Sequence, residues 1–212
     1  MNKFLILAAL TGCLLLVITT SPAAAQAADQ KMREINVTTD SVPGWLPSVE
    51  LEATALQTVE KFFDLNDDGD YQASYAMLNP GTRALINFED FRKDNASFRA
   101  EAGKLLRRHI IKTTWTKDPA NAPSPGIYAA IDATATFQGV GRQCGYVILY
   151  QSPQGGPFSV MRTESNYIAN TSAKEIERNQ SRAALDRLWA GLSGNCPNFQ
   201  VLPPAPASSP RT

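Results

Sequence analysis

The chain has 212 residues, with 20 basic and 20 acidic side chains and a formal net charge of +0 at pH 7. This balance gives no electrostatic support to the binding of nucleic acid or of an anionic membrane surface. A single histidine and three cysteines without a C-x-x-C spacing give no support to a metal site. We therefore expect no metal, no cofactor and no nucleic-acid partner.

Residues 1–27 have the layout of a secretory signal peptide. Lys3 precedes an unbroken apolar run from Phe4 to Ile18, and a small-residue stretch ends in Ala25-Gln26-Ala27. These features match the charged region, the apolar region and the A-x-A cleavage site of a signal. A retained anchor would need about 20 apolar residues to span a bilayer. We expect cleavage, a periplasmic or secreted protein, and no stable membrane insertion afterwards.

A lipid anchor is a second interpretation of this segment. Leu10-Thr11-Gly12-Cys13 has the form of a bacterial lipobox, in which the cysteine becomes acylated. The residues after Cys13 are apolar, however, where a lipoprotein normally presents a polar tether. We therefore favour Cys13 as part of the apolar region of the signal.

Removal of Cys13 leaves Cys144 and Cys196. In an oxidising compartment such a pair predicts one disulfide, with two unpaired thiols as the alternative. Closing the long loop between them would stabilise the fold by about 4 kcal/mol on the chain-entropy model. The bond would attach a C-terminal helix to a sheet.

Two segments of the mature chain lack a sustained hydrophobic period. Residues 28–47 are polar and contain two prolines, which predicts a flexible lead-in. Residues 197–212 include a Pro/Ser-rich end and are predicted to be a disordered tail. Between them we expect a single domain over residues 48–196.

Hydrophobic periodicity predicts helices first in this domain and strands afterwards. Helical spacing begins after Ser48, a candidate N-cap, and returns twice, the last time before Gly103 as a candidate C-cap. The predicted helices cover residues 48–65, 71–78 and 88–102, with a final helix over 172–192.

A period of two follows the third predicted helix and indicates strands. Residues 127–137 alternate most clearly, and Ser152-Pro153-Gln154-Gly155-Gly156 predicts a hairpin turn between the last two strands. The predicted strands are 105–117, 127–137, 143–151 and 158–163. This order predicts an α+β fold, in which N-terminal helices pack on a curved four-stranded antiparallel sheet and an extra helix follows.

Four features along roughly residues 52–168 carry a resemblance to a known family. They are Asp64–Tyr75, Gly103–Arg108, the Pro125-Gly126-Ile127-Tyr128 segment and the paired C-terminal strands. They resemble the bacterial domain-of-unknown-function 4019 family. The resemblance implies a secreted or periplasmic protein with an NTF2-like or cystatin-like sheet, no established activity and no catalytic residues. Phe158 stands where the family's last hairpin usually has Trp, and the cysteine pair and the final helix lie outside its pattern.

Residues 64–69 match the first half of an EF-hand loop, D-x-N-x-D-G. Position twelve of such a loop would be Tyr75, so the bidentate carboxylate that completes a calcium site is missing. We favour a polar, glycine-ended connection between two helices over calcium binding.

Two glycine-rich segments fail as functional motifs. Gly139–Cys144 begins like a dinucleotide-binding loop, but Cys144 replaces the third glycine and no helix follows. We expect a hairpin turn there. Gly191–Asn195 lacks the final glycine of a nucleophile elbow and follows a helix, not a strand.

His109 is the only histidine, and it lies among basic residues that could bind an anion. Alternation along the strand predicts Arg107 and His109 on one face, with Arg108 and Lys112 on the other. The charge is then divided between two faces, which favours a solvated edge strand protected by cations.

Four side chains are candidates for a pocket on the sheet. Arg162 and Glu164 alternate with apolar residues on the fourth predicted strand, and would lie at a pocket mouth if their face lines the concave side. NTF2-like proteins include isomerases with a buried Asp and a Tyr, and Asp132 and Tyr146 could take those parts. Analogy between folds does not by itself establish function.

The sequence therefore predicts a non-catalytic domain that binds a small ligand or an envelope protein. The alternative is an NTF2-like enzyme of isomerase or hydrolase type that uses a pocket carboxylate and a tyrosine. An apolar pocket would favour binding. We assign no catalytic residue from the sequence.

Overall fold

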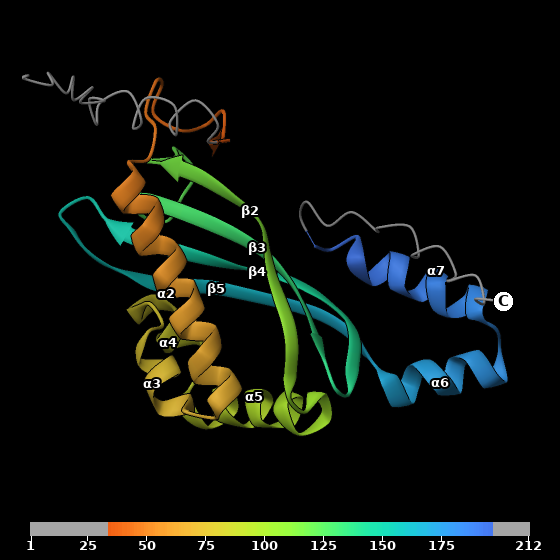
Figure 1. The fold of residues 1–212 in the computed structure, drawn as a ribbon. Coiled ribbons are helices and arrows are strands. Elements are labelled where there is room, and N and C mark those ends of the chain that lie inside the picture. Colours follow the sequence, from red (N-terminus) through yellow and green to blue (C-terminus); the bar gives the residue numbers. More distant parts are fainter. Residues whose placement is uncertain (1–33, 197–212) are drawn as a thin grey trace, which may run out of the picture. The chain divides into compact units, whose positions relative to one another are not determined.

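The computed structural model describes residues 34–196 (Figure 1). The expected signal peptide, Cys13 and the expected tail lie outside these residues. The described helices and strands are β1 (Asn36–Val37), α2 (Val49–Asp68), α3 (Tyr71–Ala76), α4 (Pro80–Leu85), α5 (Phe88–Ala102), β2 (Leu105–Lys117), β3 (Ile127–Phe137), β4 (Val140–Ser152), β5 (Gly155–Ala169), α6 (Asn170–Asn179) and α7 (Arg182–Ser193). This order confirms the predicted α+β class.

The sheet has five strands in the order β1-β2-β3-β4-β5. Strands β2 to β5 pair antiparallel, as predicted. The prediction of four strands is wrong in one detail, because β1 adds a fifth strand that runs parallel to β2. Each pair of neighbouring strands is also adjacent in the chain, so β2 to β5 form a meander.

Strand β1 comes from the segment predicted to be a flexible lead-in. Its two residues pair with Thr114 and Trp115. Further along the lead-in, the Trp45 ring meets the Trp115 ring edge to face, with 6.5 Å between centroids. A strand of two residues shows no period, so only its pairing with a distant part of the chain reveals it.

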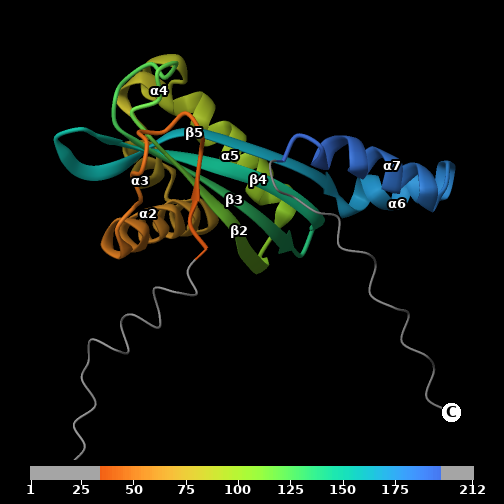
Figure 2. The ribbon, with the colours of Figure 1, turned by 90° about the horizontal axis from the view of Figure 1, so that it is seen from above.

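Helix α2 packs across one face of the sheet, which we call the helix face (Figures 1 and 2). Val59 and Phe62 of α2 are buried against side chains such as Trp115, Ile131 and Leu149 from three strands. Burying an apolar side chain of this size stabilises a fold by about 1.5–3 kcal/mol. This core fixes α2 on the sheet.

The caps of α2 and α5 follow the sequence. Ser48 is the N-cap of α2 and accepts a hydrogen bond from the backbone N–H of Leu51 at 3.1 Å. Gly69 ends α2 with a φ of 80°, a left-handed conformation that glycine adopts without a steric penalty. Gly103 is the C-cap of α5, as predicted.

Residues 64–68 form the last turns of α2, so the predicted connection begins later than expected. The Asn66 side chain donates to the carbonyl of Phe62 at 2.7 Å. The Asp67 carboxylate binds Arg108 at 2.7 Å. Because an EF-hand needs these residues in an open loop, their helical conformation does not form the first half of a calcium site.

Two helical segments differ from the prediction. Helix α4 was not expected, because Asn79-Pro80-Gly81 reads as a stop; in the structure Asn79 is the N-cap and Pro80 occupies the first turn. The single helix expected over 172–192 is two helices, α6 and α7. Ser181 separates them and caps α7 by accepting from the N–H of Ala184.

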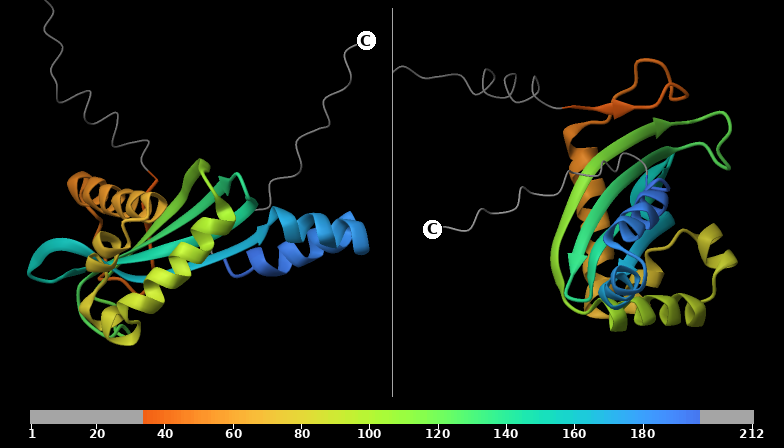
Figure 3. Two further views of the ribbon diagram at one scale, coloured as in Figure 1. Left: turned by 90° about the horizontal axis from the view of Figure 1, so that it is seen from below. Right: turned by 90° about the vertical axis from the view of Figure 1, so that its right-hand side faces the viewer.

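Helices α6 and α7 lie at one end of the sheet, and α2, α3 and α4 lie toward the other (Figures 1 and 3). Leu185 and Trp189 of α7 pack against Cys144 and Ile168. Cys144 forms a disulfide with Cys196, with 6.1 Å between the Cα atoms. The predicted disulfide therefore attaches the end of α7 to β4.

The face of the sheet opposite α2 we call the open face. In β4 it carries Cys144, Tyr146, Ile148 and Tyr150, which alternate with the buried Val147 and Leu149 of the helix face. Helix α7 covers the end of the open face around Cys144. The rest of this face contains the candidate site.

Candidate functional site

An irregularity in β5 decides which side chains reach the open face. Ile148 pairs with Arg162, whereas the next residue, Leu149, pairs with Val160. Met161 is therefore an extra residue, and this bulge reverses the alternation beyond it. Val160 is buried on the helix face, and Arg162 and Glu164 lie on the open face.

Three of the four predicted pocket residues lie in one row across the open face. Asp132 of β3 pairs with Tyr146 of β4, which pairs with Glu164 of β5. Lys112 of β2 extends the row on the other side of Asp132. Asp132 is only 2% exposed, so the carboxylate is held within the protein.

The predicted division of charge on β2 is wrong for Lys112. A second register shift, between Ile110 and Lys112, makes Ile111 an extra residue. Lys112 therefore shares the open face with Arg107 and His109, which pair with Thr136 and Thr134. Arg108 alone lies on the helix face, where it binds Asp67.

Arg162 joins the row through Tyr146 and Glu164. Its guanidinium lies over the Tyr146 ring, 5.7 Å from the centroid. It is 3.6 Å from the Glu164 carboxylate, and the two side chains are 62% and 39% exposed. The structure thus brings the four predicted residues together on the open face. Arg162 and Glu164 are exposed to solvent there, whereas Asp132 is buried.

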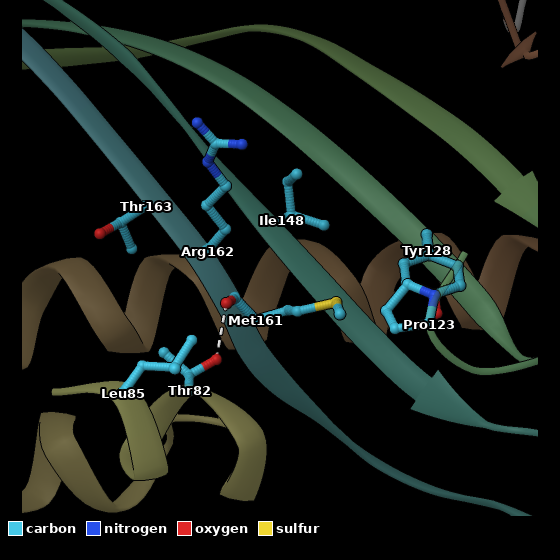
Figure 4. Close-up of a pocket in the computed structure, with 8 residues that line it drawn as sticks. All are labelled: Thr82, Leu85, Pro123, Tyr128, Ile148, Met161, Arg162 and Thr163. Atoms are coloured by element: carbon cyan, nitrogen blue, oxygen red, sulfur yellow. Dashed lines mark hydrogen bonds between the residues drawn. The ribbon is translucent and has the colours of Figure 1, made fainter. Parts of the chain in front are cut away.

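A pocket of about 530 Å³ lies beside this row, toward α4 (Figure 4). Met161 points toward Tyr128 and Pro123, and Ile148 lies between them and Arg162 (Figure 4). Arg162 is the one predicted residue in the lining. The lining consists of Thr82, Leu85, Pro123, Tyr128, Ile148, Met161, Arg162 and Thr163.

One wall of the pocket is α4, which is fastened to β5. The backbone N–H of Asn79 donates to the carbonyl of Val160 at 2.7 Å, and the N–H of Val160 donates to the carbonyl of Met77 at 2.8 Å. The Thr82 hydroxyl donates to the carbonyl of Met161 at 2.6 Å (Figure 4). These bonds hold Thr82 and Leu85 beside the bulge.

The turn between β2 and β3 forms the opposite wall. Two tyrosines of the open face hold it: Tyr128 donates to the carbonyl of Ser124 at 2.5 Å, and Tyr150 donates to the carbonyl of Pro125 at 2.9 Å. Their rings are in contact, with 5.1 Å between centroids. These bonds hold the turn that carries Pro123 against the open face.

Of these two tyrosines, Tyr128 has a raised pKa and stays neutral around pH 7. Burial raises the pKa of Tyr128 above its usual 10.0, and the nearby Tyr150 and Asp118 raise it further. The Tyr128 hydroxyl thus serves as a donor that holds the turn.

Neither wall was predicted from the sequence. Thr82 and Leu85 belong to the unexpected helix α4, and Thr82 meets Met161 across 79 positions of the chain. Pro123 lies in the Pro-rich turn, where the sequence gives a turn signal but not the direction of the turn. The only signal for this wall is the pair of open-face tyrosines at the strand ends.

Within residues 34–196, no three side chains of His, Cys, Asp or Glu come together in a way that could hold a metal ion. Also within this range, none of the helices combines the length and apolar character that crossing a bilayer requires.

A family model described as "Protein of unknown function (DUF4019)" matches residues 58–176. The chain belongs to the DUF4019 family. No curated protein and no solved structure matches it. The DUF4019 match runs from within α2 to within α6 and contains the whole pocket lining, while α7 and Cys196 lie beyond it. The disulfide therefore attaches to the sheet a helix, α7, that lies outside the residues matched by the family model.

Proposed function

We propose that this DUF4019 protein is an exported, non-catalytic domain that binds a small, largely apolar ligand in the open-face pocket. The pocket carries the proposal: it measures about 530 Å³ and is lined by apolar groups such as Leu85, Ile148 and Met161. Ligand pockets of proteins usually measure about 300–1,000 Å³ and combine an apolar lining with a few polar groups. Removal of this lining from water would drive binding.

The finer description of the fold belongs to the same proposal. An NTF2-like or cystatin-like sheet is supported by α2, a helix of 20 residues that packs across long antiparallel strands. Strands β2 to β5 have 11 to 15 residues each. With α2 on one face, the other face is available to a ligand.

Export is supported by the disulfide, because disulfides persist in oxidising compartments. The sequence of residues 1–27 supports it independently. The intact mass of the exported chain tests both points. A chain that begins at Ala28 agrees with a cleaved signal, whereas an N-terminal acylated Cys13 would show a lipid-anchored protein.

A protein partner in the envelope is the second form of the binding proposal. Its support is the exposure of large apolar side chains, above all Leu85 at the pocket, which is 91% exposed. Small molecules bind in concave sites more readily than flat protein surfaces do, so we favour the small ligand.

The enzyme alternative draws on Asp132, buried and directly opposite Tyr146 in the sheet. A buried carboxylate beside a tyrosine suits proton transfer. Neither residue lines the pocket, however, and this favours binding. An unchanged turnover in Asp132→Asn, measured on any reaction found for the protein, would remove the alternative.

The binding proposal is tested with N-phenyl-1-naphthylamine, a neutral apolar probe whose fluorescence rises in apolar pockets. The protein should bind it, and Ile148→Trp should weaken binding by about tenfold, since steric overlap typically costs 1–3 kcal/mol. Ile111→Trp is the matched control, because Ile111 is 40% exposed on β2 and outside the lining. Absence of binding, or equal loss in both variants, would contradict the proposal.

A further inference from the structure

We infer that the ligand is an amphipathic anion, with an apolar body in the pocket and an acidic group on Arg162. This inference rests on the proposed function and names the chemical class of the ligand. Its starting point is the composition of the lining, in which Arg162 is the one charged side chain among the eight residues. A single cation at a site with no other charge and a largely apolar lining selects a molecule with one anionic end.

The interactions of Arg162 leave its guanidinium able to accept a ligand. The guanidinium has five N–H donors and no acceptor. Its distance of 3.6 Å from Glu164 is longer than a charge-assisted hydrogen bond, which is about 2.7–2.9 Å. The contact with the Tyr146 ring, 5.7 Å from its centroid, is an attraction between the charge and the ring and not a hydrogen bond, so it does not use up an N–H donor.

The other ion-paired arginines near the sheet are engaged differently. Arg108 holds Asp67 at 2.7 Å with both side chains below 20% exposure, at 17% and 18%. Arg142 holds Asp186 at 2.8 Å. Both pairs have the short distances of structural ion pairs, and neither arginine lines the pocket. Arg162 lies farther from its carboxylate partner, at 3.6 Å. Its side chain is also more exposed, at 62%, and it lines the pocket.

Glu164 gives the site a built-in competitor. Its carboxylate lies on the open face next to Arg162 and would be replaced by the acidic group of the ligand. A ligand that displaced it would gain a bidentate contact with the guanidinium fork. Tyr146, beneath the guanidinium, would keep the fork oriented.

Two fluorescent probes with the same aromatic body test the inference. N-phenyl-1-naphthylamine is neutral, and 1-anilinonaphthalene-8-sulfonate adds a sulfonate to that body. Arg162→Gln should weaken binding of the sulfonate by about tenfold to a hundredfold, the range for hydrogen bonds to charged groups, and leave the neutral probe within about twofold. Glu164→Gln should strengthen binding of the sulfonate.

Arg83→Gln is the matched control for a general effect of charge. Arg83 follows Thr82 on α4, is exposed, and is not part of the lining. It should leave both affinities unchanged. As a second measurement, decanoate should displace the neutral probe at a lower concentration than decanol does, and Arg162→Gln should abolish that difference.

The outcomes separate this inference from the proposed function. Binding of both probes with no dependence on Arg162 would overturn the anion and leave the apolar pocket standing. Failure of both probes to bind would overturn both. Equal losses in Arg162→Gln and Arg83→Gln would overturn the inference, because the effect would then follow net charge and not the site.

Discussion

Arg108 holds the carboxylate of Asp67 with two hydrogen bonds, of 2.7 and 3.2 Å, and joins β2 to the last turn of α2. The same guanidinium lies over the Phe63 ring, 4.4 Å from its centroid. The two charged side chains are only 17% and 18% exposed. One arginine thus fastens the C-terminal end of α2 to the sheet by charge and by packing.

Replacement of Arg108 by Gln should lower the free energy of unfolding by about 2 kcal/mol, between the values for exposed and fully buried pairs. The cause is the unpaired carboxylate left at Asp67. Arg108→Lys should recover part of the loss, because lysine restores the charge but not the fork. Urea unfolding measures both.

The exposed pair Arg92–Glu89 is the control for this measurement, since its side chains are 48% and 70% exposed. Arg92→Gln should change the free energy of unfolding by less than about 0.5 kcal/mol. Equal losses at Arg92 and Arg108 would show that partial burial of the second pair has no energetic effect.

The disulfide predicts a second effect on stability. Cys144→Ala with Cys196→Ala should lower the free energy of unfolding by about 4 kcal/mol on the chain-entropy model. Reduction of the unaltered protein should move the urea midpoint in the same direction. In hydrogen exchange, α6 and α7 should lose protection before α2, because the bond fastens α7 to β4. Unchanged exchange in α7 would contradict this assignment.

At Gly145, strands β4 and β5 lie too close together to leave room for a side chain. A Cβ atom there would be 2.0 Å from the backbone oxygen of Glu164, which is backbone and unable to rotate away. Gly145→Ala should therefore cost about 3 kcal/mol or more by forcing the strands apart. Thermal unfolding and the yield of soluble protein measure the effect.

The matched control is Gly191→Ala, in α7, where a Cβ atom would meet nothing within 4 Å. Alanine stabilises a helix interior by about 0.5–1 kcal/mol relative to glycine, so this variant should be slightly more stable. A Gly145→Ala protein as stable as Gly191→Ala would show that the strands adjust freely.

Alkaline titration should reveal the environment of Tyr167. Burial, followed by its hydrogen bond to Glu101, raises the pKa of Tyr167 above the usual 10.0. Because the folded pKa is above the unfolded one, the stabilisation is complete below pH 10 and is lost as the pH rises through the folded value. Tyrosinate absorbance at 295 nm should therefore lose a late-titrating component in Tyr167→Phe. Loss of an early component would contradict the raised pKa.

Periodicity predicted a large part of the fold because it records burial directly. Alternation in residues 127–137 put Ile131 and Asp132 on opposite faces, and the structure agrees, since Ile131 is in the helix-face core and Asp132 pairs with Tyr146. The N-cap at Ser48 and the C-cap at Gly103 were also predicted, because caps depend on local backbone geometry.

The bulges at Ile111 and Met161 mark where this reasoning stops. Each bulge adds one residue to its strand, so that the residues after it point to the opposite face of the sheet. No residue type in the sequence marks these positions. Strand β1 and the contact of Thr82 with Met161 depend on pairing across 78 and 79 positions, which a local pattern does not record. Four residues named from the sequence therefore lie together on the open face, but no signal in the sequence marked the hollow beside them.

The hydrogen bonds that fasten α4 to β5 also occupy the outer edge of β5. A bare strand rim is a template on which another copy of the chain can add, and Asn79 and Thr82 take up the carbonyls of Val160 and Met161 that would start such growth. Loosening α4 to widen the pocket would therefore expose the unpaired backbone groups of β5 to another strand. A change that opens this wall would be expected to raise the tendency of the chain to polymerise edge to edge.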